Sequence, residues 1–118
     1  MEDLKKETIE YLSILDGNHS VLKTLHWNAD KHCEHLLTDD IDDDVLEFED
    51  SLAEQAMGCG GFKFGVKELK SMIPNASNLK DLLFELKGDT IDYYNTLGDD
   101  KKYAGIRSSV EEFISKID

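Results

Sequence analysis

The sequence predicts an all-α protein, an antiparallel four-helix bundle that forms one domain over residues 1–118. Apolar side chains make up 40% of the chain, recur at helical spacing and suffice for one hydrophobic core. Pro74 is the one proline, and glycine-rich stretches separate the periodic segments. These features favour four principal helices. A short extra helix is expected in the link between the second and third helices.

The first half of the chain carries two long helical patterns. The first runs over about residues 4–28, and the second over about residues 31–57. Gly17 is a weak point in the first pattern, because glycine lowers helix stability by about 1 kcal/mol relative to alanine. The glycine-rich stretch 58–61 is expected to end the second helix.

The second half begins with the expected short helix, at about residues 66–72, which must stop before Pro74. Ser77 is a suitable N-cap for the third long helix. A turn at residues 98–100 then leads into a last helix over residues 103–117.

The charge balance limits the classes of partner. The chain holds 13 basic and 26 acidic residues, a formal net charge of −13, so we do not expect it to bind nucleic acid phosphates. Nor do we expect a membrane span, because no apolar run approaches the roughly 18 residues that one needs. Cys33 and Cys59 form no disulfide framework, and no signal-peptide pattern is seen, so a cytoplasmic setting is expected.

The acidic residues concentrate in the second helix. Residues 30–54 contain 11 of the 26 carboxylates and a single base, Lys31. On a helical wheel at about 100° per residue, this segment has two opposite faces. The apolar face, expected to pack into the bundle, consists of Leu37, Ile41, Val45, Phe48, Leu52 and Ala56. The opposite face consists of His35, Asp39, Asp43, Leu46, Asp50 and Glu54.

The opposite face contains two pairs of potential metal ligands, each pair spaced by one helical turn. The pairs are His35 with Asp39, and Asp50 with Glu54. Asp39 and Asp50 lie roughly 16 Å apart along the axis at about 1.5 Å per residue, a gap that ligand distances near about 2 Å cannot span. One chain therefore cannot join both pairs in a single site. A solvated acidic face without ligands is the plain alternative.

Two-fold symmetry would bring the two pairs together. They are placed symmetrically about residues 44 and 45. If two copies cross antiparallel at that point, each histidine–aspartate pair faces the aspartate–glutamate pair of the other copy, and the dimer holds two identical sites. Carboxylates with one or two imidazoles suit Fe(II), and less specifically Mn(II) or Zn(II). A cation would also offset the cost of packing negative charge across the interface.

Several short motifs resemble those of the Dps-like miniferritins. In chain order they are Leu25-His26-Trp27-Asn28, the spacing from His35 to Asp39, Asp50-Ser51-Leu52-Ala53-Glu54, and Gly60-Gly61. The segment from Gly60 through Gly65 to Pro74 is similar to that family's link, which carries a short helix. The resemblance covers about residues 20–80, and the remaining helices match only in pattern.

This resemblance implies a ferritin-like fold and a ferroxidase centre shared between two subunits. It assigns as ligands and catalytic residues His26, His35 and Asp39 of one chain with Asp50 and Glu54 of the other. In that family Fe(II) is bound at the centre, oxidised by hydrogen peroxide or O₂, and stored as ferric oxide inside a twelve-subunit shell. An iron-binding homo-oligomer with ferroxidase activity is therefore expected.

Departures from the family pattern leave alternatives open. The segment between His26 and His35 is a few residues shorter than in the family, and His32 is a rival ligand. Because the last two helices are short, a dimer or a reduced shell competes with the twelve-subunit shell. Lysine-rich tails, with which some members bind DNA, are absent. The alternative function is a non-catalytic acidic helical adaptor, or a mimic of nucleic acid, that keeps the fold without iron chemistry.

Overall fold

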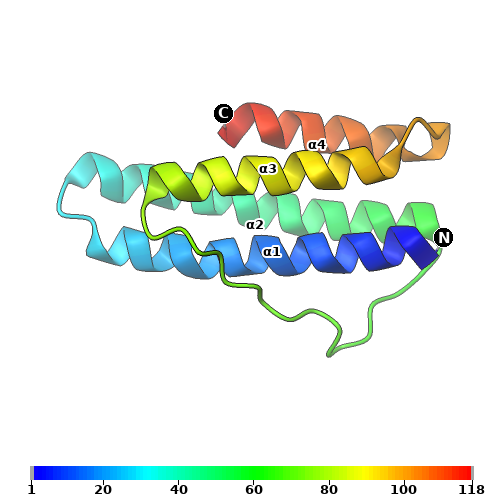
Figure 1. Cartoon of the computed structure of the whole chain (residues 1–118), viewed down its shortest axis with the longest axis horizontal. Coiled ribbons are helices and arrows are strands. Elements are labelled where there is room, and N and C mark those ends of the chain that lie inside the picture. Colours follow the sequence, from blue (N-terminus) through cyan, green and yellow to red (C-terminus); the bar gives the residue numbers. More distant parts are fainter. Residues whose placement is uncertain (1, 118) are drawn as a thin grey trace.

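The computed structural model describes residues 2–117 and shows an all-helical chain. Its elements are α1 (Glu2–Asn28), α2 (His32–Gly60), α3 (Leu79–Leu97), a 3₁₀ turn η1 (Lys101–Tyr103) and α4 (Ala104–Ile117) (Figure 1). The four expected principal helices are confirmed, with their ends shifted by a few residues. Among the described residues, no helix combines the length and the apolar character that crossing a membrane requires.

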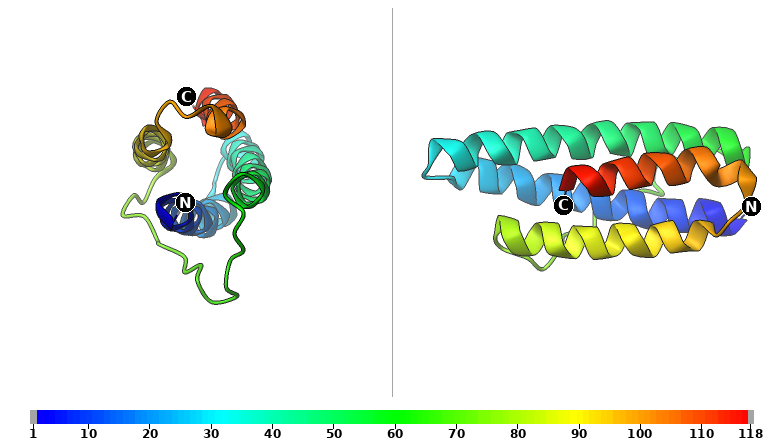
Figure 2. Two further views of the ribbon diagram at one scale, coloured as in Figure 1. Left: turned by 90° about the vertical axis from the view of Figure 1, so that its right-hand side faces the viewer. Right: turned by 90° about the horizontal axis from the view of Figure 1, so that it is seen from above.

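The four helices lie around a common core. α1 packs against α2 and α3, and α4 packs against the same two helices. Seen end-on, α1 and α4 therefore occupy opposite corners of the bundle (Figure 2). The α1–α2 pair extends beyond α3 and α4 at the end that holds the turn at residues 29–31, so the core is less covered there (Figure 1).

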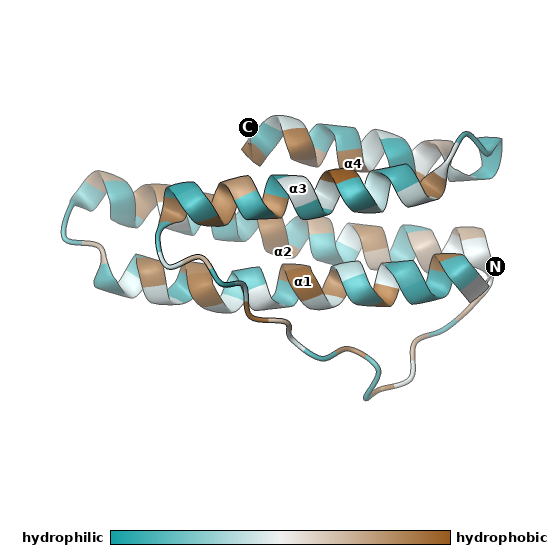
Figure 3. Cartoon of the chain, in the orientation of Figure 1, coloured by the Kyte–Doolittle hydropathy of each residue, from teal (hydrophilic) through white to brown (hydrophobic). Residues whose placement is uncertain are grey.

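Each helix contributes an apolar stripe to the core, visible as hydrophobic bands along the ribbons in Figure 3. On α2 the predicted stripe is confirmed at its buried members Ile41, Val45, Phe48, Leu52 and Ala56. Leu37, assigned to the same stripe, is instead 48% exposed. The reason is that Lys116, near the end of α4, lies beside Asp44, so α4 does not reach the level of Leu37.

Two tyrosine–threonine hydrogen bonds fix the register of α1 against α3. The Tyr11 hydroxyl lies 2.7 Å from Thr90 Oγ1, and the Tyr93 hydroxyl lies 2.9 Å from Thr8 Oγ1. Thr90 Oγ1 donates to the Leu86 carbonyl oxygen at 2.7 Å and therefore accepts the Tyr11 proton. The two rings stack with centroids 4.6 Å apart. Burial raises the pKa of both phenols, to about 12 for Tyr93, so both stay protonated inside the core.

The link at residues 61–78 contains no helix, so the short helix expected at about residues 66–72 is wrong. Part of the link backbone bonds to α1, and within the link the Glu68 N–H donates to the Gly65 carbonyl oxygen at 3.1 Å. The Met72 N–H donates to the Ser13 carbonyl oxygen at 3.0 Å, and the Lys70 N–H donates to Ser13 Oγ at 3.3 Å. The contacts with Ser13 hold the later part of the link against α1 on its way to α3, whereas the part before them loops out from the bundle (Figure 1).

Gly17 allows the link to approach α1 this closely. A β-carbon at this position would overlap the Met72 carbonyl group and would lie 3.0 Å from the Ile73 nitrogen. The neighbouring Asp16 carboxylate accepts a hydrogen bond from the Ser71 hydroxyl. Gly17 is therefore a contact point between α1 and the link, and not only a weak point of the helix.

Hydrogen bonds also hold the ends of two helices. Asn78, and not the expected Ser77, caps α3, because its Oδ1 accepts from the Asp81 N–H at 2.9 Å. At the end of α2, Cys59 Sγ donates to the Lys102 carbonyl oxygen of η1 at 2.8 Å. Both cysteines of the chain are free thiols.

Candidate metal site on α2

α2 presents its acidic face to solvent. Asp39, Asp43, Asp50 and Glu54 are all exposed, and Leu46 on the same face is 40% exposed. The predicted division of this helix into a core face and an outward face is confirmed for these residues. Their carboxylates are therefore accessible to a ligand or to another copy of the chain.

His26 of α1 and His35 of α2 face each other across the turn between the two helices. Their rings stack with centroids 3.7 Å apart. His26 Nδ1 lies 2.7 Å from the His35 carbonyl oxygen, and His35 Nδ1 lies 2.9 Å from the His26 carbonyl oxygen. Because a carbonyl oxygen only accepts, each Nδ1 carries a proton and donates it. With Nδ1 used in this way, Nε2 is the ring nitrogen left to bind a metal.

Thr38 supports this histidine pair from the core side. It is 3% exposed, and its Oγ1 donates to the Glu34 carbonyl oxygen at 2.9 Å. The same Oγ1 lies 3.1 Å from the His35 carbonyl oxygen and 3.5 Å from His26 Nδ1. Sequence reasoning missed Thr38, although its position on the buried side of the helical wheel was an available signal.

Within one chain, the structure brings together part of the predicted ligand set. His26 and His35 are in contact, and Asp39 follows His35 by one helical turn. Asp50 and Glu54 lie further along the same helix. Among the described side chains, no three from histidine, cysteine, aspartate and glutamate lie close enough together to hold a metal ion. Asp39 therefore does not join His26 and His35 in a three-ligand group within one chain. Asp50 and Glu54 are separated from the histidines by several helical turns.

Trp27 and His32 lie beside the histidine pair at the surface. Trp27 is 70% exposed, and Lys23 Nζ lies 5.8 Å from the centroid of its ring. His32 is exposed, with its ring centroid 6.5 Å from that of His35. The reciprocal carbonyl hydrogen bonds orient His26 and His35, and this makes them better placed as ligands than His32.

A second group of charged side chains joins α1 to α2 nearer the middle of the bundle. His19 Nδ1 lies 2.6 Å from Asp42 Oδ1. Glu49 lies two turns after Asp42 and is half-buried. Burial, reinforced by the charge of Asp16, raises the pKa of Glu49 to about 7. Asp42 and Glu49 therefore belong to the contact with α1, which the count of acidic residues did not reveal.

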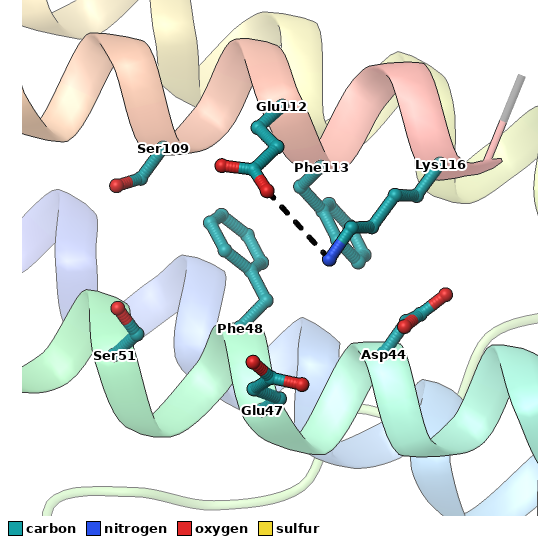
Figure 4. Close-up of a pocket in the computed structure, with 8 residues that line it drawn as sticks. All are labelled: Asp44, Glu47, Phe48, Ser51, Ser109, Glu112, Phe113 and Lys116. Atoms are coloured by element: carbon teal, nitrogen blue, oxygen red, sulfur yellow. Dashed lines mark ion pairs between the residues drawn. The ribbon is translucent and has the colours of Figure 1, made fainter.

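A small polar pocket lies on the other side of α2, against α4 (Figure 4). Asp44 of α2 and Glu112 of α4 are among the residues that line it. Lys116 Nζ lies 3.8 Å from Glu112 Oε1 and supplies positive charge inside the pocket. Phe48 and Phe113 stack beneath it with centroids 4.2 Å apart. In this pocket of about 90 Å³, the Lys116 ammonium group pairs with one of the three carboxylates that line it.

The outward face of α2 thus offers imidazole nitrogen together with carboxylate oxygen. This mixture favours first-row divalent metal ions over Mg²⁺ or Ca²⁺, which prefer oxygen alone. The chain matches no protein-family model, no curated protein and no solved structure. Function is therefore inferred from the residues and the geometry of the chain itself.

Proposed function

We propose that the protein is a miniferritin-like, iron-binding protein that oxidises Fe(II) at sites shared between two copies of the chain. One observation carries this proposal: one end of α2 holds the exposed Asp39 and His35, whose ring is oriented by its contact with His26 of α1, and the exposed Asp50 and Glu54 lie on the same face further along the helix. An antiparallel crossing near residues 44 and 45 would join the two ends of different copies into two identical sites. The exposure of this face leaves it free for such a contact.

The path of the chain supports a ferritin-like, antiparallel bundle. In Figure 1 the ribbon runs in opposite directions along neighbouring helices. The link at residues 61–78 carries the chain back along the bundle between α2 and α3. A four-helix bundle with one such long crossover is the arrangement of ferritin-like folds.

The chemistry of the donor set fits iron as a substrate. His26 and His35 would bind Fe(II) through Nε2, and the carboxylates of Asp39, Asp50 and Glu54 would balance its charge. Fe(III) is a harder acid than Fe(II), so carboxylate oxygen stabilises the oxidised product more than the substrate. Hydrogen peroxide or O₂ would accept the electrons, and Mn(II) or Zn(II) would compete for the same ligands. Storage of ferric oxide would require an assembly larger than the dimer, such as a twelve-subunit shell.

Oxidation of Fe(II) tests this proposal. Fe(II) is added to the protein without oxygen, peroxide follows, and the near-ultraviolet absorbance of Fe(III) is recorded. We expect Asp39→Ala and Asp50→Ala each to slow the fast phase by about tenfold or more, because each removes a charged ligand. Asp40→Ala removes the same charge from the neighbouring exposed position and is the matched control, expected to stay within about twofold of the unaltered protein.

Two results would reject this proposal. One is a fast phase no larger than that of the buffer alone. The other is an unchanged rate in both ligand variants. The first result would favour the non-catalytic acidic adaptor or nucleic-acid mimic, whose binding would tolerate the loss of one carboxylate. The second would show that any iron oxidation does not depend on Asp39 and Asp50.

A further inference from the structure

The less covered end of the bundle contains an apolar pocket that is lined by none of the proposed iron ligands. Its volume is about 530 Å³, which is in the range of pockets that bind another molecule. Four leucines line it, namely Leu25, Leu37, Leu79 and Leu83. The residues that line it come from the tip of the α1–α2 pair, the end of the link and the first turns of α3. In Figure 1 the tip of the α1–α2 pair lies beyond the end of α4.

An exposed aromatic side chain lies next to this pocket. Phe84 of α3 is 82% exposed. It follows Leu83 directly and lies one helical turn after Lys80, and both of these residues line the pocket. An exposed aromatic ring beside an apolar pocket is typical of an association surface, where aromatic anchors fill pockets of the partner.

The charges at the pocket match a second copy of the chain despite the net charge of −13. The charged residues that line it among the described residues are Glu34 and Lys80, one of each sign. If two copies face each other here, Lys80 of each copy can approach Glu34 of the other. Complementary charges at a rim favour association, whereas the acidic faces elsewhere on the chain repel each other.

We propose that this pocket binds Phe84 of a second copy, in a symmetric contact in which each copy inserts its ring into the other. Leu37, in the pocket, and His35 belong to opposite sides of α2, so this contact is separate from the one that forms the iron site. It requires no iron. Together, the two contacts link the proposed dimers into a larger assembly.

Sedimentation equilibrium of the whole chain tests the contact. Phe84→Ser should weaken one association step by about tenfold or more, because it removes the aromatic anchor. Val66→Ser is the matched control, because Val66 is an apolar side chain of the link that is 99% exposed, and it should leave association unchanged. Phe84→Ser should also keep the Fe(II) oxidation rate, which separates this contact from the iron site.

A charge exchange gives a second, independent test. Lys80→Glu should weaken the same association step, and the double variant Glu34→Lys/Lys80→Glu should restore it. An apolar fluorescent dye, anilinonaphthalene sulfonate, should bind Phe84→Ser more strongly than the unaltered protein, because the pocket is then uncovered. The proposal is overturned by unchanged association of Phe84→Ser, by a double variant that fails to restore association, or by equal dye binding in both proteins.

Discussion

Replacement of Gly17 by alanine tests whether the link packs on α1 as described. In an unobstructed helix this change stabilises the fold by about 1 kcal/mol, because alanine is the better helix former. At Gly17, however, the new methyl group would overlap the Met72 carbonyl group, which is backbone and cannot rotate away. The link would have to lift, and the two hydrogen bonds from Met72 and Lys70 to Ser13 would be lost. At about 1 kcal/mol for each bond, together with lost packing, we expect a net destabilisation of about 1–2 kcal/mol.

Gly88 provides the matched control in the middle of α3. A β-carbon there would meet nothing within 4 Å, so Gly88→Ala should stabilise the protein by about 1 kcal/mol. Urea unfolding followed by circular dichroism measures both changes as shifts of the midpoint at constant slope. If Gly17→Ala stabilises the protein as much as Gly88→Ala does, the link does not lie against α1 and the reasoning is refuted.

Three further features of the fold can each be tested by substitution. Burial raises the pKa of Glu49 from 4.5 to about 7, so the free energy of unfolding should fall as the pH rises from about 4.5 to about 7. Glu49→Gln should remove this loss and stabilise the protein by about 1 kcal/mol at pH 8, after allowance for the half-exposed position of the side chain. An equal pH dependence of stability in both proteins would argue against the raised pKa. Tyr93→Phe should cost about 1–2 kcal/mol in thermal or urea unfolding because it leaves the Thr8 hydroxyl in the core without this hydrogen bond, and a neutral effect would count against the register of α1 and α3. Asn78→Ala should cost about 1 kcal/mol through loss of the α3 cap, whereas Ser77→Ala should cost little; the reverse order would place the cap at Ser77.

Helical periodicity was sufficient to predict the main elements, because each helix buries one continuous stripe. On α2 the stripe from Ile41 to Ala56 is buried as the wheel predicts. Leu37 departs from it because its burial depends on how far α4 extends, which the pattern of α2 does not encode. The short helix predicted in the link is absent because Ser13 supplies hydrogen-bond partners for the link backbone from another element. Local sequence carries no record of such a partner.

The candidate site was predictable where it depends on spacing along one helix. The positions of Asp39, Asp50 and Glu54 on one exposed face follow from the repeat of the α-helix. The mutual contact of His26 and His35 depends on the conformation of the turn between α1 and α2, and the sequence motif alone gave neither the ring stacking nor the protonated nitrogen. These features arise from tertiary contacts between two helices.

A mixing experiment with two impaired variants tests the shared site most directly. Asp39→Ala removes a ligand from the histidine–aspartate half of each site, and Asp50→Ala removes a ligand from the aspartate–glutamate half. A dimer of either variant alone therefore has no intact site. In a hybrid dimer one site carries both substitutions and the other carries neither. The two variants are refolded together from urea in equal amounts. Random pairing should then make about a quarter of all sites intact, and a fast phase of Fe(II) oxidation of corresponding size should return. A mixture as slow as the separate variants would contradict a site built from two copies of the chain.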